Sequence, residues 1–112
     1  MQIEFDDTLY SAYDLPGNNT FRVGTKWAEA LVKEPGAALE VVIDGQLQPD
    51  KIRVSHVVFG QLGTVFADNI RKNHGVVTGG TPDDVLTTLR RIYGDDLYEK
   101  PLVAIYFADV VE

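Results

Sequence analysis

Residues 52–59 alternate between two sets of side chains with the period of two that is typical of a β-strand. Ile52, Val54, His56 and Val58 would share one face, so we expect His56 on the apolar side of this strand. Weaker alternation or short apolar runs predict four further strands, and a turn and loop separate two of them. The four strands cover residues 1–5, 20–23, 38–43 and 101–110, and the turn and loop cover residues 44–50.

Two of these strands differ in how their faces are expected to be buried. Residues 102–107 are almost continuously apolar, which indicates a strand that is covered on both sides. In residues 20–23, Phe21 and Val23 would face the core, and Thr20 and Arg22 would lie on the opposite face. The short strand therefore presents a hydroxyl and a guanidinium side by side.

A second period, close to 3.6 residues, predicts three helices, at residues 25–32, 61–72 and 81–93. The third is the best marked, because Thr81 is a natural N-cap, Pro82 suits the first helical position and Gly94 provides the stop. Residues 73–75 are expected to end the second helix. Residues 76–80 would then form a glycine-rich connector.

The order of the elements indicates the fold class. Strands outnumber helices, and two helices fall together before the last strand. This order predicts an α+β fold, a small partial β-barrel of mostly antiparallel strands with two or three short helices packed on it. No repeat, low-complexity segment or linker interrupts the chain, so we expect a single domain over residues 1–112.

The composition narrows the classes of function. The absence of cysteine excludes disulfides, thiolate metal sites and cysteine nucleophiles. The two histidines lie far apart in the sequence, so we expect no metal and no cofactor. A net charge of −7 disfavours non-specific binding to duplex nucleic acid. It does not exclude a small basic cleft that binds one nucleotide or a short strand. Without a signal peptide or an apolar run near the roughly 20 residues of a membrane helix, we expect a cytoplasmic protein with no membrane contact.

Three segments carry a resemblance to a known family. The first is the glycine turn and short strand at residues 17–22, and the second is the glycine-led strand at residues 36–42. The third is the helix at residues 81–93, which ends in a tyrosine, with the apolar strand at residues 102–107 after it. Together they resemble the ASCH family, a branch of the PUA-like β-barrels. The resemblance spans roughly residues 17–110 and implies a single ASCH-like, PUA-like domain with a ligand-binding cleft.

The family signature is Gly-x-Lys-x-x-x-x-Arg on a strand that lines the cleft. Gly17 and Arg22 resemble its two ends at a spacing two residues shorter, and Asn19 stands where the lysine is expected. Members that cleave the amide of acetylated cytidine use a lysine, a threonine and a glutamate. Thr20 matches that threonine, and Lys26 is a candidate for the missing charge. The resemblance thus implies the cleft. Of the three residues that the hydrolase members use, only the threonine has a match in this sequence.

The ligand-binding candidates gather on and after this strand: Thr20, Arg22, Lys26 and Trp27. The guanidinium of Arg22 would hold a phosphate or the carbonyl edge of a base, and the alternative is a solvated arginine paired with an acid. Trp27 would stack on a base, although a single tryptophan in a small domain more often fills the core.

The catalytic candidates are Thr20, Lys26 and His56. His56 would serve as a general base near neutral pH, and the alternative is a hydrogen-bonded core histidine. Outside this set, His74 lies near Arg71 and Lys72, where it would join a phosphate-contacting patch or, more simply, cap the end of a helix.

Three functions remain open after these observations. The first is binding of a nucleotide, a modified base or a short single-stranded RNA in a cleft lined by Thr20 and Arg22. The second is a small amidohydrolase or ribonuclease on the same scaffold. The third is an acidic protein-interaction or inhibitor module, motivated by the acidic residues near both ends. Its candidate residues are Asp6, Asp7, Asp95 and Asp96.

Overall fold

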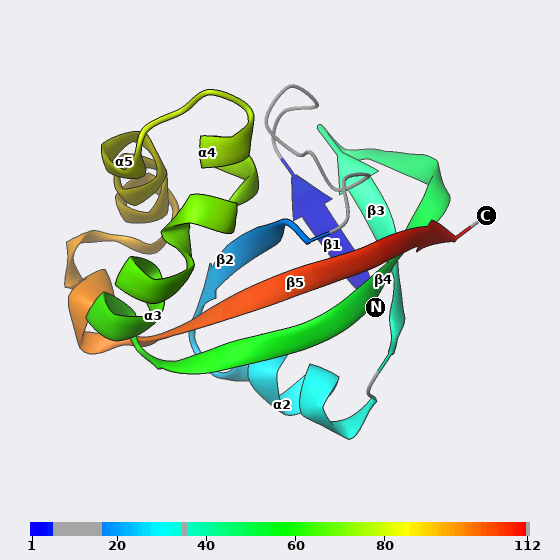
Figure 1. Cartoon of the computed structure of the whole chain (residues 1–112), viewed down its shortest axis with the longest axis horizontal. Helices are drawn as coiled ribbons and strands as arrows, with labels where there is room; N and C mark the ends of the chain where they lie inside the picture. The colour runs from blue at the N-terminus through cyan, green and yellow to red at the C-terminus, as the bar shows by residue number, and fades with distance from the viewer. Residues whose placement is uncertain (6–16, 35, 112) are drawn as a thin grey trace.

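The computed structural model describes residues 1–5, 17–34 and 36–111 of the chain. It confirms the predicted α+β class: five strands form a curled half-barrel, and helices pack on it (Figure 1). The strands are β1 (Gln2–Phe5), β2 (Asn19–Val23), β3 (Ala38–Ile43), β4 (Gln46–Gln61) and β5 (Pro101–Val111). The helices are α2 (Lys26–Lys33), α3 (Leu62–Asn69), α4 (His74–Val77) and α5 (Pro82–Tyr93), with short 3-10 turns η1 (Ile70–Lys72) and η2 (Asp95–Glu99).

The sheet has the order β1-β3-β4-β5-β2, so β1 and β2 are its two outer strands. The β1–β3 pair is parallel, and the other three pairs are antiparallel. The long strands β4 and β5 cross the whole molecule in Figure 1, with α3, α4 and α5 gathered on one side. Because the sheet curls, its outer strands approach each other across an open side, which we call the seam.

Apolar side chains form two cores, one on each face of β5. The interior core lies inside the curl and includes Val103, Ile105 and Phe107 of β5, with Ala28 and Leu31 of α2 packed into it. The outer core includes Leu102 and Ala104 of β5 and lies under α3, α5 and η2. The prediction that residues 102–107 are covered on both faces is thus confirmed, because alternate side chains enter different cores.

Strand β2 is also covered on both faces. Phe21 is 5% exposed and lies in the outer core, beside Val23, as predicted. Thr20 and Arg22 therefore point to the interior side of the curl rather than to open solvent. This placement brings their polar groups into the concave side of the half-barrel.

The face predicted for His56 is wrong. A register shift between Val54 and His56 interrupts the alternation of β4, after Ile52 and Val54 have both entered the interior core. Such a bulge inserts an extra residue and exchanges the two faces beyond it. As a result Val57, not His56, packs against the interior core, and His56 is exposed. The loop expected at residues 46–50 is also wrong, since these residues form the start of β4.

Helix α5 begins and ends with the residues that the sequence predicts. Thr81 is its N-cap, with a reciprocal capping box to Asp84, Pro82 opens the first turn, and Gly94 follows the last with a φ of 93°. The expectation for residues 73–75 is wrong, because Asn73 starts a new short helix instead of ending the previous one. Its side-chain oxygen accepts a hydrogen bond from the backbone N–H of Gly75 at 2.9 Å.

Candidate functional site

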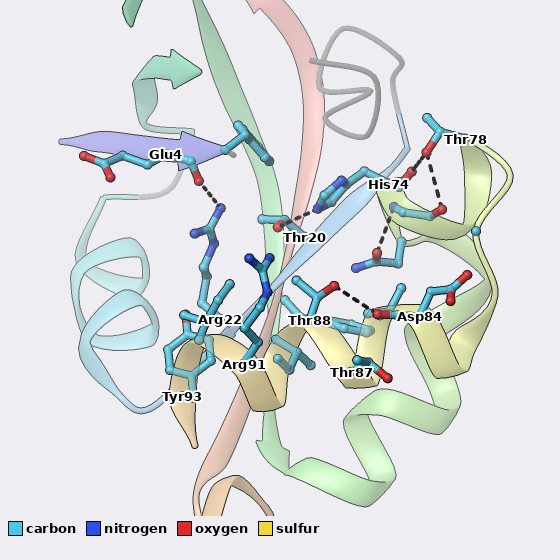
Figure 2. Close-up of a pocket in the computed structure, with 18 of the residues that line it drawn as sticks. Glu4, Thr20, Arg22, His74, Thr78, Asp84, Thr87, Thr88, Arg91 and Tyr93 are labelled. Atoms are coloured by element: carbon cyan, nitrogen blue, oxygen red, sulfur yellow. Dashed lines mark hydrogen bonds between the residues drawn. The ribbon is translucent and has the colours of Figure 1, made fainter. Parts of the chain in front are cut away.

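A cavity of about 820 Å³ lies between the seam and the two helices α4 and α5. Its wall combines the ends of β1 and β2 with the glycine-rich turn that joins the helices. The volume falls within the range of about 300–1,000 Å³ found for small-molecule sites. The polar side chains of its lining include Thr20, Arg22, His74, Asp84, Thr88 and Arg91, and Figure 2 shows them around the hollow.

Arg22 spans the seam from β2 to β1. Its Nη2 donates a hydrogen bond to the backbone oxygen of Glu4 at 2.8 Å, and its guanidinium carbon lies 5.4 Å from the centre of the Phe5 ring. The acceptor is a backbone carbonyl, so this bond itself leaves the positive charge of Arg22 intact. The side chain therefore holds the two outer strands together and brings a cation to the cavity wall.

Thr20 and His74 meet because the residues before them are paired. Asn19 and Asn73 form a parallel β-bridge, which sets the next residues of the two segments side by side. Thr20 Oγ1 and His74 Nε2 are 3.2 Å apart, and the direction of this hydrogen bond depends on the ring tautomer. The imidazole also meets the Phe5 ring edge-to-face, with 5.3 Å between the centroids.

The electrostatics of the wall hold His74 neutral. Burial, and in second place the positive charge of Arg22, lower the pKa of His74 to about 4. Both effects penalise the imidazolium form. At neutral pH the ring is therefore a hydrogen-bonding group without charge, and a poor acceptor of a proton.

A buried chain of amides anchors this corner of the cavity. Asn19, which is 0% exposed, accepts a hydrogen bond from Nδ2 of Asn73 at 3.2 Å and donates one to the backbone oxygen of Asn69 at 2.9 Å. Asn69 in turn donates to the backbone oxygen of Val65 and accepts from the hydroxyl of Tyr106. The network ties α3, η1 and α4 to strand β2, and so fixes His74 relative to Thr20.

Helix α5 presents a polar stripe to the cavity. Asp84, Thr88 and Arg91 lie at positions i, i+4 and i+7, which is one face of a helix. Asp84 Oδ2 accepts the N–H of Thr81 at 2.9 Å, so this carboxylate serves the start of the helix. Figure 2 shows the guanidinium groups of Arg22 and Arg91 directed into the same part of the cavity.

The residues proposed from the sequence separate into two groups. Thr20 and Arg22 line the cavity. Lys26 is exposed at the start of α2, and Trp27 is half-buried against the interior core, so neither belongs to this wall. His56 lies on the exposed surface of β4, where Nδ1 is 2.8 Å from Ser55 Oγ and the ring stacks on Tyr106 with 4.4 Å between centroids.

The acidic residues of the interaction hypothesis lie elsewhere. Asp95 and Asp96 are exposed in η2, and Asp96 is 3.6 Å from Lys100. Asp6 and Asp7 lie outside the described residues.

Sequence reasoning missed Arg91 and Thr88 and gave His74 only a minor place. The pattern of α5 held a signal for the first two, since polar residues at i, i+4 and i+7 form a stripe beside the apolar one. For His74 the signal was weak, because only the bridge from Asn73 to Asn19 brings it to Thr20.

Two features are absent from the residues that the structure describes, a metal-binding cluster and a membrane-spanning helix. No group of three histidine, aspartate or glutamate side chains there is placed to hold a metal ion. None of the helices in residues 1–5, 17–34 and 36–111 is long and apolar enough to cross a bilayer.

Comparisons with known proteins bear on the fold. No family model matches the chain, and no curated protein sequence matches it either. Among solved structures, the chain is similar to protein PF0455 from Pyrococcus furiosus, a structural genomics target solved by NMR in solution. The TM-score is 0.60 at 16% sequence identity, and the match covers 96% of each chain. At this identity the likeness shows a shared fold over nearly the whole chain.

Proposed function

We propose that the cavity between the seam and helices α4 and α5 binds a nucleotide or a short single-stranded RNA. The observation that carries the proposal is the convergence of Thr20, Arg22, His74 and Arg91 on one hollow of suitable volume. Arginine forks and hydroxyls are the groups that proteins use for phosphate oxygens and base edges. The resemblance of residues 17–22 and 81–107 to ASCH-like, PUA-like domains supports the same cleft.

The net charge of the protein favours a local binding site over binding along the backbone of a nucleic acid. The chain as a whole has a net charge of −7, so a long nucleic acid is repelled by most of the surface. Two arginines, Arg22 and Arg91, line the same cavity. A small ligand meets both guanidinium groups there without covering the acidic remainder of the molecule.

The test is binding of a fluorescently labelled, short single-stranded RNA at low salt, followed by anisotropy. We expect Arg22→Ala to weaken binding by about 10- to 100-fold, the value of a charge-assisted hydrogen bond. Arg53→Ala is the matched control, because it removes the same charge at a distant position. Arg53 is exposed and pairs with Asp109 at 3.3 Å. It should leave the affinity almost unchanged.

Arg22 also holds the seam, so the experiment needs a variant that separates the two roles. Arg22→Lys keeps the positive charge, the long stem over Phe5 and a donor for the Glu4 carbonyl, but lacks the planar fork. We expect a folded protein with clearly reduced affinity. Unchanged binding by folded Arg22→Ala and Arg22→Lys proteins would refute the proposed site.

One observation favours a second candidate, a hydrolase. Thr20 Oγ1 lies 3.2 Å from His74 Nε2, which is the spacing of a hydroxyl nucleophile and its base. Against this, Thr20 is only 2% exposed, and a histidine with a pKa of about 4 removes a proton poorly at neutral pH. The geometry therefore supports binding better than turnover.

The two candidates are distinguished by incubating concentrated protein with acetylated cytidine and, separately, with RNA. We expect neither cytidine nor RNA fragments above the background of a protein-free sample. Product formation that disappears in Thr20→Val, which keeps the shape but removes the hydroxyl, would establish the hydrolase instead.

A further inference from the structure

A pair of stacked rings lies outside the cavity, on the surface of β4 and β5. His56 of β4 is opposite Tyr106 of β5 in the antiparallel register. The two rings are nearly parallel, with 10° between their planes and 4.4 Å between their centroids. Neither residue lines the cavity, so the proposed site does not account for this arrangement.

The bulge of β4 turns His56 outward. In an uninterrupted strand His56 would share the face of Val54, which is buried in the interior core. The register shift between these two residues leaves both Ser55 and His56 exposed. Bulges are frequent next to functional sites, where they re-aim a side chain. A ring that regular alternation would bury is here presented to solvent.

The imidazole of His56 is held on two sides. Its Nδ1 lies 2.8 Å from Ser55 Oγ, and the ring of Tyr106 covers one of its faces. Tyr106 is fixed in turn, because its hydroxyl donates a hydrogen bond to Asn69 Oδ1 in the buried amide network. A binding surface loses affinity when the ligand must first order its side chains. These two rings are ordered before a ligand arrives.

Two parts of the imidazole are available to a ligand. Tyr106 covers one face of the ring, and no second ring of the described residues stacks on the other. Nε2 makes no hydrogen bond to any described residue. A flat aromatic system with hydrogen-bonding edges matches both parts, and nucleobases have this chemistry.

We propose that the open face of His56 stacks on a base of a single-stranded RNA, with Tyr106 as the supporting ring beneath. This inference rests on the proposed function and extends it, because the ligand is then a strand of several nucleotides. Asn19 of β2 is paired with Tyr106, which is paired with His56. Two strand spacings, about 10 Å, therefore separate the backbone beside Thr20 in the cavity wall from that of His56.

The first measurement is the affinity for a short, labelled oligoadenylate at low salt, followed by anisotropy. His56→Ala is expected to weaken binding by about 5- to 150-fold, the effect of losing one stack between a base and an aromatic side chain. His56→Phe keeps a ring and should bind within about threefold of the wild type. Urea unfolding of both variants verifies that they are folded.

Phe59→Ala is the matched control. It removes another exposed ring of β4, and Phe59 lies against α2 instead of beside Tyr106. This variant should bind the oligoadenylate with unchanged affinity.

The second measurement observes the stack directly by NMR. The carbon-bound ring protons of His56 should move upfield when the oligoadenylate is added, because a stacked base shields protons above its plane. The signals are assigned by their absence from the His56→Phe protein. Ring protons that do not move at saturating RNA would contradict the stack.

The variants separate this inference from the proposed function. Equal affinities of wild type and folded His56→Ala, or equal losses in His56→Ala and His56→Phe, would overturn the stack. The cavity proposal still stands in that case if Arg22→Ala weakens binding. A loss in His56→Ala without a loss in Arg22→Ala would support the stack and overturn the cavity. Failure of the wild type to bind any oligomer would overturn both.

Discussion

Replacing Asn19 with leucine is expected to lower the free energy of unfolding by about 2–6 kcal/mol. The amide of Asn19 is the middle link between Asn73 and the backbone of Asn69, and its side chain is fully buried. Leucine has a similar size but neither donates nor accepts a hydrogen bond. Each buried polar group that loses its partner costs about 1–3 kcal/mol, and two are affected.

The measurement is urea unfolding of the wild type and of the Asn19→Leu variant, with the slope compared as well as the midpoint. Gln46→Leu is the control, because it replaces an exposed amide at the start of β4 and should change stability by less than about 0.5 kcal/mol. An Asn19→Leu protein as stable as the control would show that the amide network does not hold α4 to β2.

Acidification from pH 7 to pH 4 is expected to remove about 3 kcal/mol of stability through His74 alone. Its pKa in the folded protein is about 4, lowered from 6.5 by burial and by Arg22. Between these two values the unfolded chain binds a proton that the folded chain does not. Stability is therefore complete above about pH 6.5, falls as the pH is lowered toward 4, and loses nothing further from this group below that.

This component is isolated by comparing the wild type with His74→Gln, which does not titrate. The difference in unfolding free energy between the two proteins should shrink by about 3 kcal/mol between pH 7 and pH 4. His56→Gln removes the exposed histidine and serves as the matched substitution. An NMR titration of the His74 ring gives the direct check, and a midpoint near 6.5 would contradict the environment described for this side chain.

Much of the architecture follows from local patterns, and the departures have particular causes. Strands β1, β2, β3 and β5 and helices α2, α3 and α5 agree with the periodicity of the chain to within a few residues. Strand β4 does not, because its bulges depend on pairing with β5 and leave no mark in the sequence of residues 52–59. His56 was consequently placed on the wrong face.

The cavity was predictable only in part. Alternation alone places Thr20 and Arg22 on one face of β2, and both line the hollow. Lys26 is close to Arg22 in sequence, but it opens a helix whose buried face is set by Ala28 and Leu31, so it points outward. The long-range partners His74 and Arg91 depend on how helices α4 and α5 close over the sheet, and short-range patterns do not contain that information.

The size of the cavity depends on the seam between β1 and β2. In a closed barrel, backbone pairing between neighbouring strands fixes the diameter, and a single substitution changes it little. Here the outer strands are joined by the Arg22 side chain and its bond to Glu4. The width of the opening is therefore encoded in side chains rather than in strand register. A protein built in this way can acquire a different specificity through point mutations at the mouth, while its sheet stays the same.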